Sequence, residues 1–228
     1  MDLVPDRIFP LGDSALTVEF GNAVTEEFND AAVALADRLN AHPFPGLIEA
    51  VPAFASTTVY YNPFALTGDR GETVAFEIVR SRVMDALQFD TAGSERTRKL
   101  VRIPLDLRKN AALDLGAIES FSGLSSAEVI DIFLSRTYRV FMLGFLPGFA
   151  YMGSVDERIA IPRRRVPRLS VPPGSVGIAG RQTGIYPRIS PGGWQIIGRT
   201  GIDLLTDNPE SPCLFHPGDE VRFERIYA

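Results

Sequence analysis

Hydrophobic and polar positions in the first third of the chain alternate between the two-residue period of strands and the longer period of helices. From Leu16 to Phe20 every second residue is apolar, which predicts a half-buried strand over Ser14–Phe20. Two further short apolar stretches predict strands at Leu47–Val51 and Thr57–Tyr61. These strands would share one sheet.

Two helices are predicted between and after these strands. Thr25 is a suitable N-cap for a helix whose apolar residues recur every three or four positions until Pro43 ends it. A second amphipathic helix is predicted from about Glu72 to Leu87. The order strand, helix, strand, strand, helix favours an α+β (ferredoxin-like) domain, which we place at residues 1–92.

A polar stretch, Thr91–Lys99, reads as a linker to a second domain at residues 98–228. This domain begins with a predicted strand, Leu100–Leu105, and two short helices, Leu113–Phe121 and Ser126–Ser135, the second opened by a capping box at Ser125. The pair resembles a helix-turn-helix, but it is acidic and a phosphate backbone would repel it. We therefore expect the two helices to pack on the domain and do not expect nucleic-acid binding.

The rest of the second domain consists of short apolar runs separated by glycine and proline. This density of strand and turn signals predicts a closed or nearly closed β-barrel. The expected strands are Tyr138–Leu143, Val176–Ala179, Gly184–Tyr186, Gln195–Arg199, Ile202–Leu205 and Glu220–Ile226.

Composition narrows the class of protein. With 45% hydrophobic and 22% charged residues the chain is typical of a globular protein, and no apolar run approaches the roughly 20 residues that cross a bilayer. The first seven residues do not resemble a signal peptide, so a cytoplasmic location without membrane association is expected. Cys213 is the one cysteine, and His42 and His216 are both next to proline, so neither a metal site nor a histidine-based triad is expected.

Positive charge is concentrated in one segment. Residues 158–199, here called the arginine belt, contain eight arginines and no lysine, aspartate or glutamate, while the whole chain has a net charge of −5, which leaves −13 for the remainder. A segment that carries arginine and no lysine favours binding of a carboxylate or phosphate group by the planar guanidinium. The alternative is a barrel rim held by salt bridges to the acidic remainder. Within the belt, Arg163–Arg165 read as solvated charge, and Arg168, fixed after Pro167, is the better candidate for an anion contact.

An aromatic loop precedes the belt. In Leu143–Gly153 glycines and Pro147 interrupt an aromatic run, so that Phe145, Phe149 and Tyr151 could line a ligand pocket or could instead close the mouth of the barrel.

A glycine-rich stretch follows the loop. Gly174, Gly177 and Gly180 are evenly spaced, but they form neither a P-loop nor a dinucleotide-binding fingerprint. Hydrogen-bonding side chains and one large flat ring come next along the chain, a mixture typical of a pocket for a small polar molecule and equally explained by turns and a core tryptophan. These residues are Gln182, Thr183, Tyr186, Ser190 and Trp194.

The longest motifs resemble one family. They are Gly144–Tyr151, Pro167–Arg168, Gly174–Val176, Ile178–Gly180, Gln182–Pro187 and Ser190–Trp194, with weaker agreement at Leu11–Leu16 and Glu19–Gly21. In these motifs the chain is similar to the carboxyltransferase-domain family to which the B subunit of 5-oxoprolinase belongs, and which also includes a sporulation histidine-kinase inhibitor and allophanate hydrolase subunit 1. It departs from the family's pattern at Phe133, where relatives often have histidine, and at Leu105–Leu107, where they often have Cys-Tyr.

The resemblance implies an α+β N-terminal domain followed by a cyclophilin-like β-barrel. It also implies a non-autonomous subunit that acts with the homologous C subunit of 5-oxoprolinase and a third subunit, with ATP as co-substrate, to open 5-oxoproline to glutamate. In that setting Arg168 and Arg199 would neutralise anionic groups. The substrate would lie beside Phe145 and Trp194, oriented by the polar side chains of Gln182, Thr183, Tyr186 and Ser190. Two alternative functions are an inhibitor of a sensor histidine kinase and a carboxyltransferase component acting on urea or allophanate. No residue is singled out as catalytic.

Overall fold

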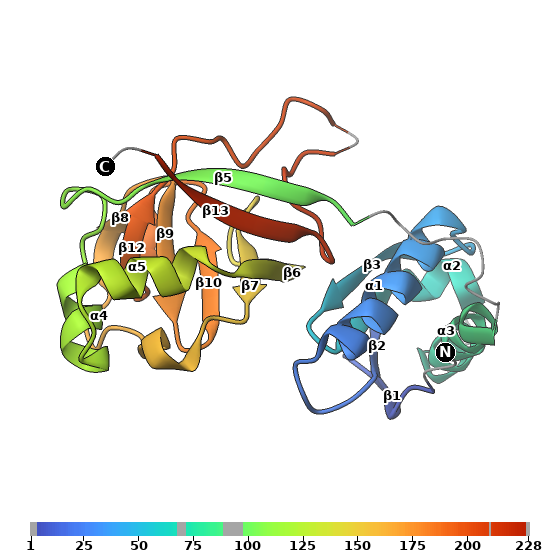
Figure 1. Cartoon of the computed structure of the whole chain (residues 1–228). Coiled ribbons are helices and arrows are strands. Elements are labelled where there is room, and N and C mark those ends of the chain that lie inside the picture. The colour runs from blue at the N-terminus through green and yellow to red at the C-terminus, as the bar shows by residue number, and fades with distance from the viewer. Residues whose placement is uncertain (1–3, 68–71, 89–97, 210, 227–228) are drawn as a thin grey trace. The chain divides into compact units, whose positions relative to one another are not determined.

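The computed structural model describes residues 4–67, 72–88, 98–209 and 211–226, and it divides the chain into two compact units, residues 1–97 and 98–228. An α+β unit is followed by a barrel unit (Figure 1), which confirms the predicted fold class. Most of the predicted linker, residues 91–97, lies outside the described residues.

The N-terminal unit is a four-stranded antiparallel sheet with helices packed on it. Its strand order is β1-β2-β4-β3, and its core joins Leu16 and Val59 of the sheet to Leu35 and Val79 of the helices. The predicted N-cap is present, because the Thr25 hydroxyl accepts the N–H of Phe28. The elements are β1 (Arg7–Pro10), β2 (Ala15–Glu19), α1 (Glu26–Ala41), β3 (Leu47–Ala53), β4 (Ser56–Tyr61), α2 (Pro63–Thr67) and α3 (Glu72–Gln88).

The second unit is built on a closed barrel with the strand order β10-β7-β6-β13-β5-β12-β9. Its elements are β5 (Leu100–Asp106), α4 (Leu115–Ser122), α5 (Ser126–Leu134), β6 (Thr137–Leu143), β7 (Ala150–Gly153), the 3₁₀ helix η2 (Glu157–Ile159), β8 (Arg168–Val171), β9 (Ser175–Ala179), β10 (Gln182–Ile185), β11 (Ser190–Gly192), β12 (Gln195–Arg199) and β13 (Glu220–Ile226). The last strand, β13, pairs in parallel with the first, β5, over seven residues, and the two run side by side in Figure 1. Strands β8 and β11 form a separate two-stranded ribbon.

Both acidic helices pack on the barrel, as their sequence predicts. Ile118 of α4 and Val129 and Phe133 of α5 are fully buried in the barrel core. The predicted capping box is complete, since Ser125 and Glu128 exchange hydrogen bonds. The Phe133 ring lies 5.0 Å from the Tyr138 ring and 5.1 Å from the Phe223 ring, so the position where relatives often have histidine is apolar core here.

The strand predicted at Ile202–Leu205 is wrong. Side chains cap the backbone in this segment: Thr200 Oγ1 accepts the N–H of Ile202 and Asp203 Oδ1 accepts the N–H of Leu205. These local bonds replace a strand ladder, and the segment keeps one isolated bridge, between Leu205 and Cys213. Conversely, β1, α2, β7, β8 and β11 form where no element was predicted.

Candidate functional site

Five aromatic side chains gather on one side of the barrel. This aromatic cluster consists of Phe145, Phe149, Tyr151, Tyr186 and Trp194, and Phe149 is its centre, with ring centroids 5.0–5.5 Å from the other four. Edge-to-face contacts of this kind add stability beyond the area that they bury. The structure therefore brings together five predicted pocket residues, but Phe149 and Trp194 are themselves buried within the cluster.

Glycines in the barrel wall make room for these rings. A Cβ at Gly184 of β10 would lie 2.8 Å from Phe149 Cζ, and one at Gly177 of β9 would lie 2.9 Å from Trp194 Cβ. The even glycine spacing thus has a packing role at Gly177 and does not form a phosphate loop. At Gly174 the φ angle is +78°, and a Cβ there would lie 2.0 Å from the Thr200 carbonyl oxygen, so this turn requires glycine.

Phe145 is held outward at the tip of the aromatic loop. Its φ angle is +69°, in the left-handed region that costs a non-glycine residue about 1–2 kcal/mol. Its side chain is 58% exposed, although its ring contacts Phe149 and Tyr186. The loop is closed by hydrogen bonds from Gly144 N to Phe149 O and from Phe149 N to Leu146 O. Strain at an exposed aromatic residue makes Phe145 a candidate for binding.

The Tyr186 hydroxyl lies against Gly192 and is hydrogen-bonded to the backbone N–H of Trp194. Burial raises the pKa of this phenol above its ordinary value, and the Trp194 N–H and the positive charges of Arg163 and Arg168 oppose that rise. The hydroxyl therefore keeps its proton at neutral pH and can donate a hydrogen bond.

The arginine belt divides into two groups. Four of its arginines pair with carboxylates from outside the belt: Arg158 with Asp156, Arg181 with Glu157, and Arg164 and Arg168 with Asp114. The other four have no carboxylate within 4 Å among the residues that the structure describes, and these are Arg163, Arg165, Arg188 and Arg199. The salt-bridged rim therefore describes half of the belt, and the anion-binding interpretation stays a prediction for the other half.

Asp114 organises one end of the belt. The residue is 4% exposed, and its carboxylate accepts hydrogen bonds from Arg164, from both terminal nitrogens of Arg168 and from the backbone N–H of Ile196, each at 2.7 Å. Asp114 occupies the N-cap position of α4, but its side chain makes no capping hydrogen bond to that helix. Arg168 therefore forms an ion pair with a carboxylate of its own chain. The sequence does not reveal this pair, because the two residues are 54 positions apart.

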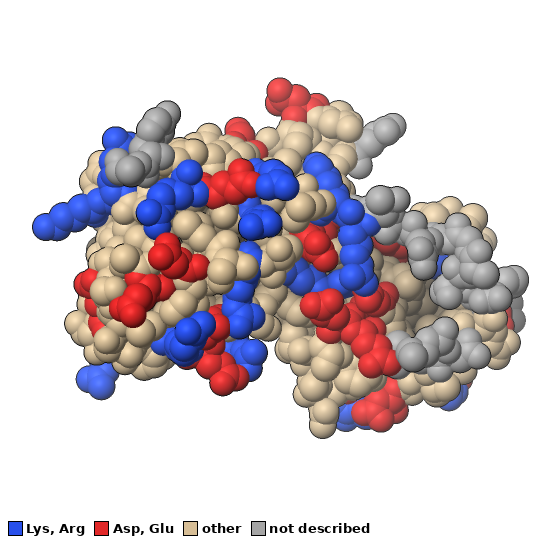
Figure 2. Space-filling model, viewed as in Figure 1, with Lys and Arg blue, Asp and Glu red and all other residues tan. Residues whose placement is uncertain are grey.

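Basic and acidic side chains also alternate elsewhere on the barrel unit. Figure 2 shows red and blue atoms interspersed over β5 and β13, where Arg102 pairs with Glu224 and Arg225 pairs with Asp131. Exposed pairs of this kind contribute little to stability.

The remaining predicted polar residues do not converge on one point. Thr183 is buried and donates to the Gly177 carbonyl oxygen at 2.9 Å, and Arg199 Nε donates to the Pro173 carbonyl oxygen at 2.9 Å. Gln182 begins β10 opposite Gly153 of β7. Ser190 is buried, and its hydroxyl has no hydrogen-bond partner among the described residues. Pro147 lies exposed in the aromatic loop.

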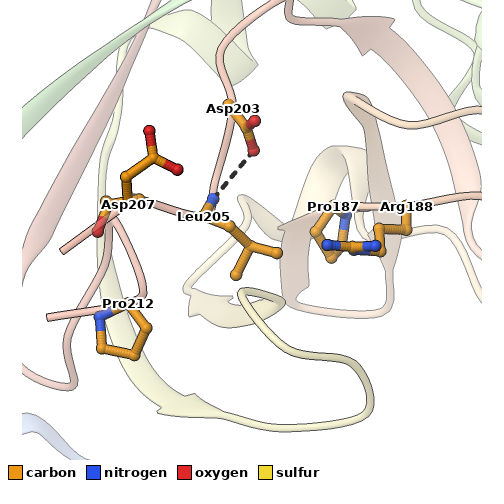
Figure 3. A pocket seen from close by; sticks show the side chains of 7 residues that line it. Pro187, Arg188, Asp203, Leu205, Asp207 and Pro212 are labelled. Atoms are coloured by element: carbon orange, nitrogen blue, oxygen red, sulfur yellow. Dashed lines mark hydrogen bonds between the residues drawn. The ribbon is translucent and has the colours of Figure 1, made fainter. Parts of the chain in front are cut away.

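A pocket of 430 Å³ opens beside the aromatic loop. Figure 3 shows Pro187 and Arg188 on one side of it, Asp207 and Pro212 on the other, and Leu205 between them; Asp203 and Thr206 complete the lining. Leu205 packs against the aromatic loop, since a Cβ at Gly148 would lie 3.0 Å from Leu205 Cδ2. Arg188 belongs to the belt, whereas no sequence pattern marks Asp203 or Asp207 as pocket residues.

No helix among the described residues is long and apolar enough to cross a membrane. Nor do they contain a group of three or more His, Cys, Asp or Glu side chains that could hold a metal ion.

Comparisons with known proteins give consistent matches. The family model described as carboxyltransferase domain, subdomain C and D, matches residues 6–215. The chain is 42% identical over 222 residues to a Bacillus subtilis protein named as the B subunit of 5-oxoprolinase, covering 96% of this chain and 92% of that one.

Two solved structures share the fold. A crystal structure of TTHA0988 is 35% identical with a TM-score of 0.80; the match covers 94% of this chain, which spans 40% of that longer one. The urea carboxylase of Kluyveromyces lactis is 21% identical with a TM-score of 0.73, covering 96% of this chain and 22% of that one, and shows a common fold alone.

Proposed function

Because the chain belongs to the carboxyltransferase domain family, subdomain C and D, we propose that it is a subunit of an ATP-dependent 5-oxoprolinase, which opens 5-oxoproline to glutamate. One observation carries this proposal: the relative named as the B subunit of 5-oxoprolinase matches at 42% identity over 92% of its own length. The coarser conclusion, that this chain is related to a hydrolase subunit, needs only that match.

The reaction uses ATP as well as 5-oxoproline, and we assign it to an assembly of subunits rather than to this chain alone. Water adds its hydroxyl group to the lactam carbonyl carbon, the C–N bond breaks, and the nitrogen takes up a proton, while ATP hydrolysis consumes a second water. The relative's printed name, a B subunit, implies further subunits. We therefore assign ATP to the assembly as co-substrate, together with the homologous C subunit of 5-oxoprolinase and a third subunit.

A partner subunit is expected to cover the aromatic loop and the β8–β11 ribbon. Phe145, Val166, Leu169 and Ile189 lie in or next to these segments, and they are 58%, 75%, 93% and 69% exposed. Exposed apolar side chains concentrated in neighbouring motifs are typical of protein interfaces. Arg163 and Arg165 carry charge without a carboxylate partner in the described chain, so the partner's surface should bear Asp or Glu opposite them.

Reconstitution tests the proposal. The chain is purified alone and with its candidate partner subunits, and glutamate release from 5-oxoproline is measured with and without ATP. We expect ATP-dependent release from the full set, and none when this chain is left out. A folded, fully assembled set that releases no glutamate would refute the proposal.

The same preparations separate the two alternative functions. Inhibition of histidine-kinase autophosphorylation by this chain alone would favour the regulator. Carboxylation of urea by an assembly that does not open 5-oxoproline would favour the carboxyltransferase.

A further inference from the structure

We infer that the pocket lined by Arg188, Asp203 and Asp207 is a binding site for a small monoanionic acid that carries an N–H next to its carboxylate. This inference rests on the proposed function and names the place on this chain where 5-oxoproline would bind. The site differs from the residues that the sequence favours, because Arg168 is occupied by Asp114.

Opposite charges line this pocket without neutralising each other. Arg188 is exposed and has no carboxylate within 4 Å among the described residues, so neither Asp203 nor Asp207 forms an ion pair with it. Figure 3 places Arg188 on one side and Asp207 on the other, with Leu205 between them. A ligand that carries both a carboxylate and a hydrogen-bond donor could therefore contact groups that do not reach each other.

The two sides offer different chemistry. Arg188 presents a planar fork of donors that suits a carboxylate. Asp203 uses Oδ1 to accept the N–H of Leu205 at 3.1 Å, which fixes its orientation while a carboxylate retains further acceptor positions. Asp203 and Asp207 can therefore accept the N–H of a lactam or an amine.

The apolar part of the pocket suits a compact ring. Pro187, Leu205 and Pro212 supply its apolar surface, and the volume of 430 Å³ falls at the lower end of the range of about 300–1,000 Å³ for small-molecule sites. Leu205 also packs against Gly148, so the pocket borders the loop that presents Phe145.

Binding of defined compounds to the purified chain tests the inference. Calorimetric titrations would use 5-oxoproline, 2-pyrrolidinone, which lacks the carboxylate, and cyclopentanecarboxylate, which lacks the lactam N–H and carbonyl. We expect 5-oxoproline to bind at least tenfold more tightly than each of the others, since one charge-assisted hydrogen bond contributes a factor of about 10 or more.

Matched variants assign the binding to this pocket. Arg188→Ala should weaken 5-oxoproline binding at least tenfold, and Asp203→Asn, which can still accept the Leu205 N–H, should weaken it less. Arg222→Ala, which removes an exposed arginine of β13 outside the pocket, should leave binding unchanged. Equal affinities of the Arg188→Ala and Arg222→Ala variants would overturn the inference, as would the absence of 5-oxoproline binding to the chain both alone and with its partner subunits.

The assembly separates failure of the site from failure of the function. If the reconstituted set releases glutamate with the same KM for 5-oxoproline in wild-type and Arg188→Ala forms, the function stands and the site is wrong. If 5-oxoproline binds as expected but no set of subunits opens it, the site stands and the proposed function is wrong.

Discussion

Asp114 and Arg168 form a bidentate ion pair in which both N–O distances are 2.7 Å. The Asp114 side chain is 4% exposed and that of Arg168 is 20% exposed, so water screens this pair only weakly. The pair ties the residue before α4 to the first residue of β8, and Arg164 adds a third bond to the same carboxylate. It fixes the start of the β8–β11 ribbon on the barrel.

Asp114→Asn should destabilise the chain. The amide keeps one acceptor for the Ile196 N–H but leaves Arg164 and Arg168 without a counter-charge. We expect a loss of roughly 2–4 kcal/mol, towards the lower part of the range for a broken buried pair because both guanidinium groups are partly exposed. Urea denaturation measures this loss in the free energy of unfolding. Asp131→Asn, which breaks the exposed pair with Arg225, should cost less than about 1 kcal/mol, and equal losses in the two variants would contradict the assignment.

Gly174→Ala and Gly180→Ala form a matched pair. Both glycines have positive φ angles, +78° and +58°, so either alanine costs about 1–2 kcal/mol of backbone strain. At Gly180 the new Cβ meets no heavy atom within 4 Å, whereas at Gly174 it would lie 2.0 Å from the Thr200 carbonyl oxygen. Gly174→Ala should therefore lose more than about 4 kcal/mol or fail to fold. Thermal unfolding of the two variants side by side measures the difference, and similar melting temperatures would show that the Gly174 turn is not tight.

Phe145→Asn should weaken association with the partner protein while changing the stability of the isolated chain little. Asparagine tolerates the left-handed backbone, and this relief of about 1–2 kcal/mol offsets the lost ring contacts with Phe149 and Tyr186, so the stability of the isolated chain should change by less than about 1 kcal/mol. Loss of the exposed ring should weaken the affinity for the partner protein by about 2 kcal/mol, roughly 30-fold. Titration of the chain with its partner measures the affinity.

Phe121→Ala is the control for this loss. Phe121 is 53% exposed on α4, outside the aromatic loop and the β8–β11 ribbon, and its removal should leave partner affinity unchanged. A partner that binds both variants as tightly as wild type would show that the aromatic loop is not at the interface.

Alkaline pH should destabilise the barrel through Tyr138. This phenol is fully buried and donates to the Phe133 carbonyl oxygen at 2.8 Å, and burial raises its pKa far above the ordinary value. Above about pH 10 the unfolded chain releases the Tyr138 proton while the folded chain retains it, so the free energy of unfolding falls with rising pH. The slope is about 1.4 kcal/mol per pH unit for this group, and its stabilising effect is complete below that pH.

Urea denaturation between pH 8 and 11 measures this slope. Tyr138→Phe should be less stable at neutral pH, because the Phe133 carbonyl loses its donor, but its stability should decline less steeply above pH 10. Tyr60→Phe, which changes an exposed tyrosine of β4, should retain the wild-type slope. Identical slopes in all three proteins would exclude Tyr138 as the cause.

The sequence by itself determines the elements whose signals are local. Thr25 caps α1 and the Ser125–Glu128 box opens α5, as their patterns predict, because capping depends on residues within one helical turn. The motifs of the aromatic loop and the glycine-rich stretch also identify the family, which the match over residues 6–215 confirms.

Even so, local chemistry can mislead. The apolar run Ile202–Leu205 has the pattern of a strand, but the side chains of Thr200 and Asp203 bond to the backbone there and prevent a ladder.

Only the tertiary structure decides which charges meet. The belt has no acidic residue of its own, and Asp114 reaches Arg164 and Arg168 across 50 and 54 positions because the fold brings α4 and β8 together. The fold also sets Arg188 across from Asp207, and barrel closure pairs β13 with β5. The periodicity of apolar residues indicates which residues are buried, but it does not indicate which residues from distant strands lie next to them. The pocket could therefore not be predicted from the sequence.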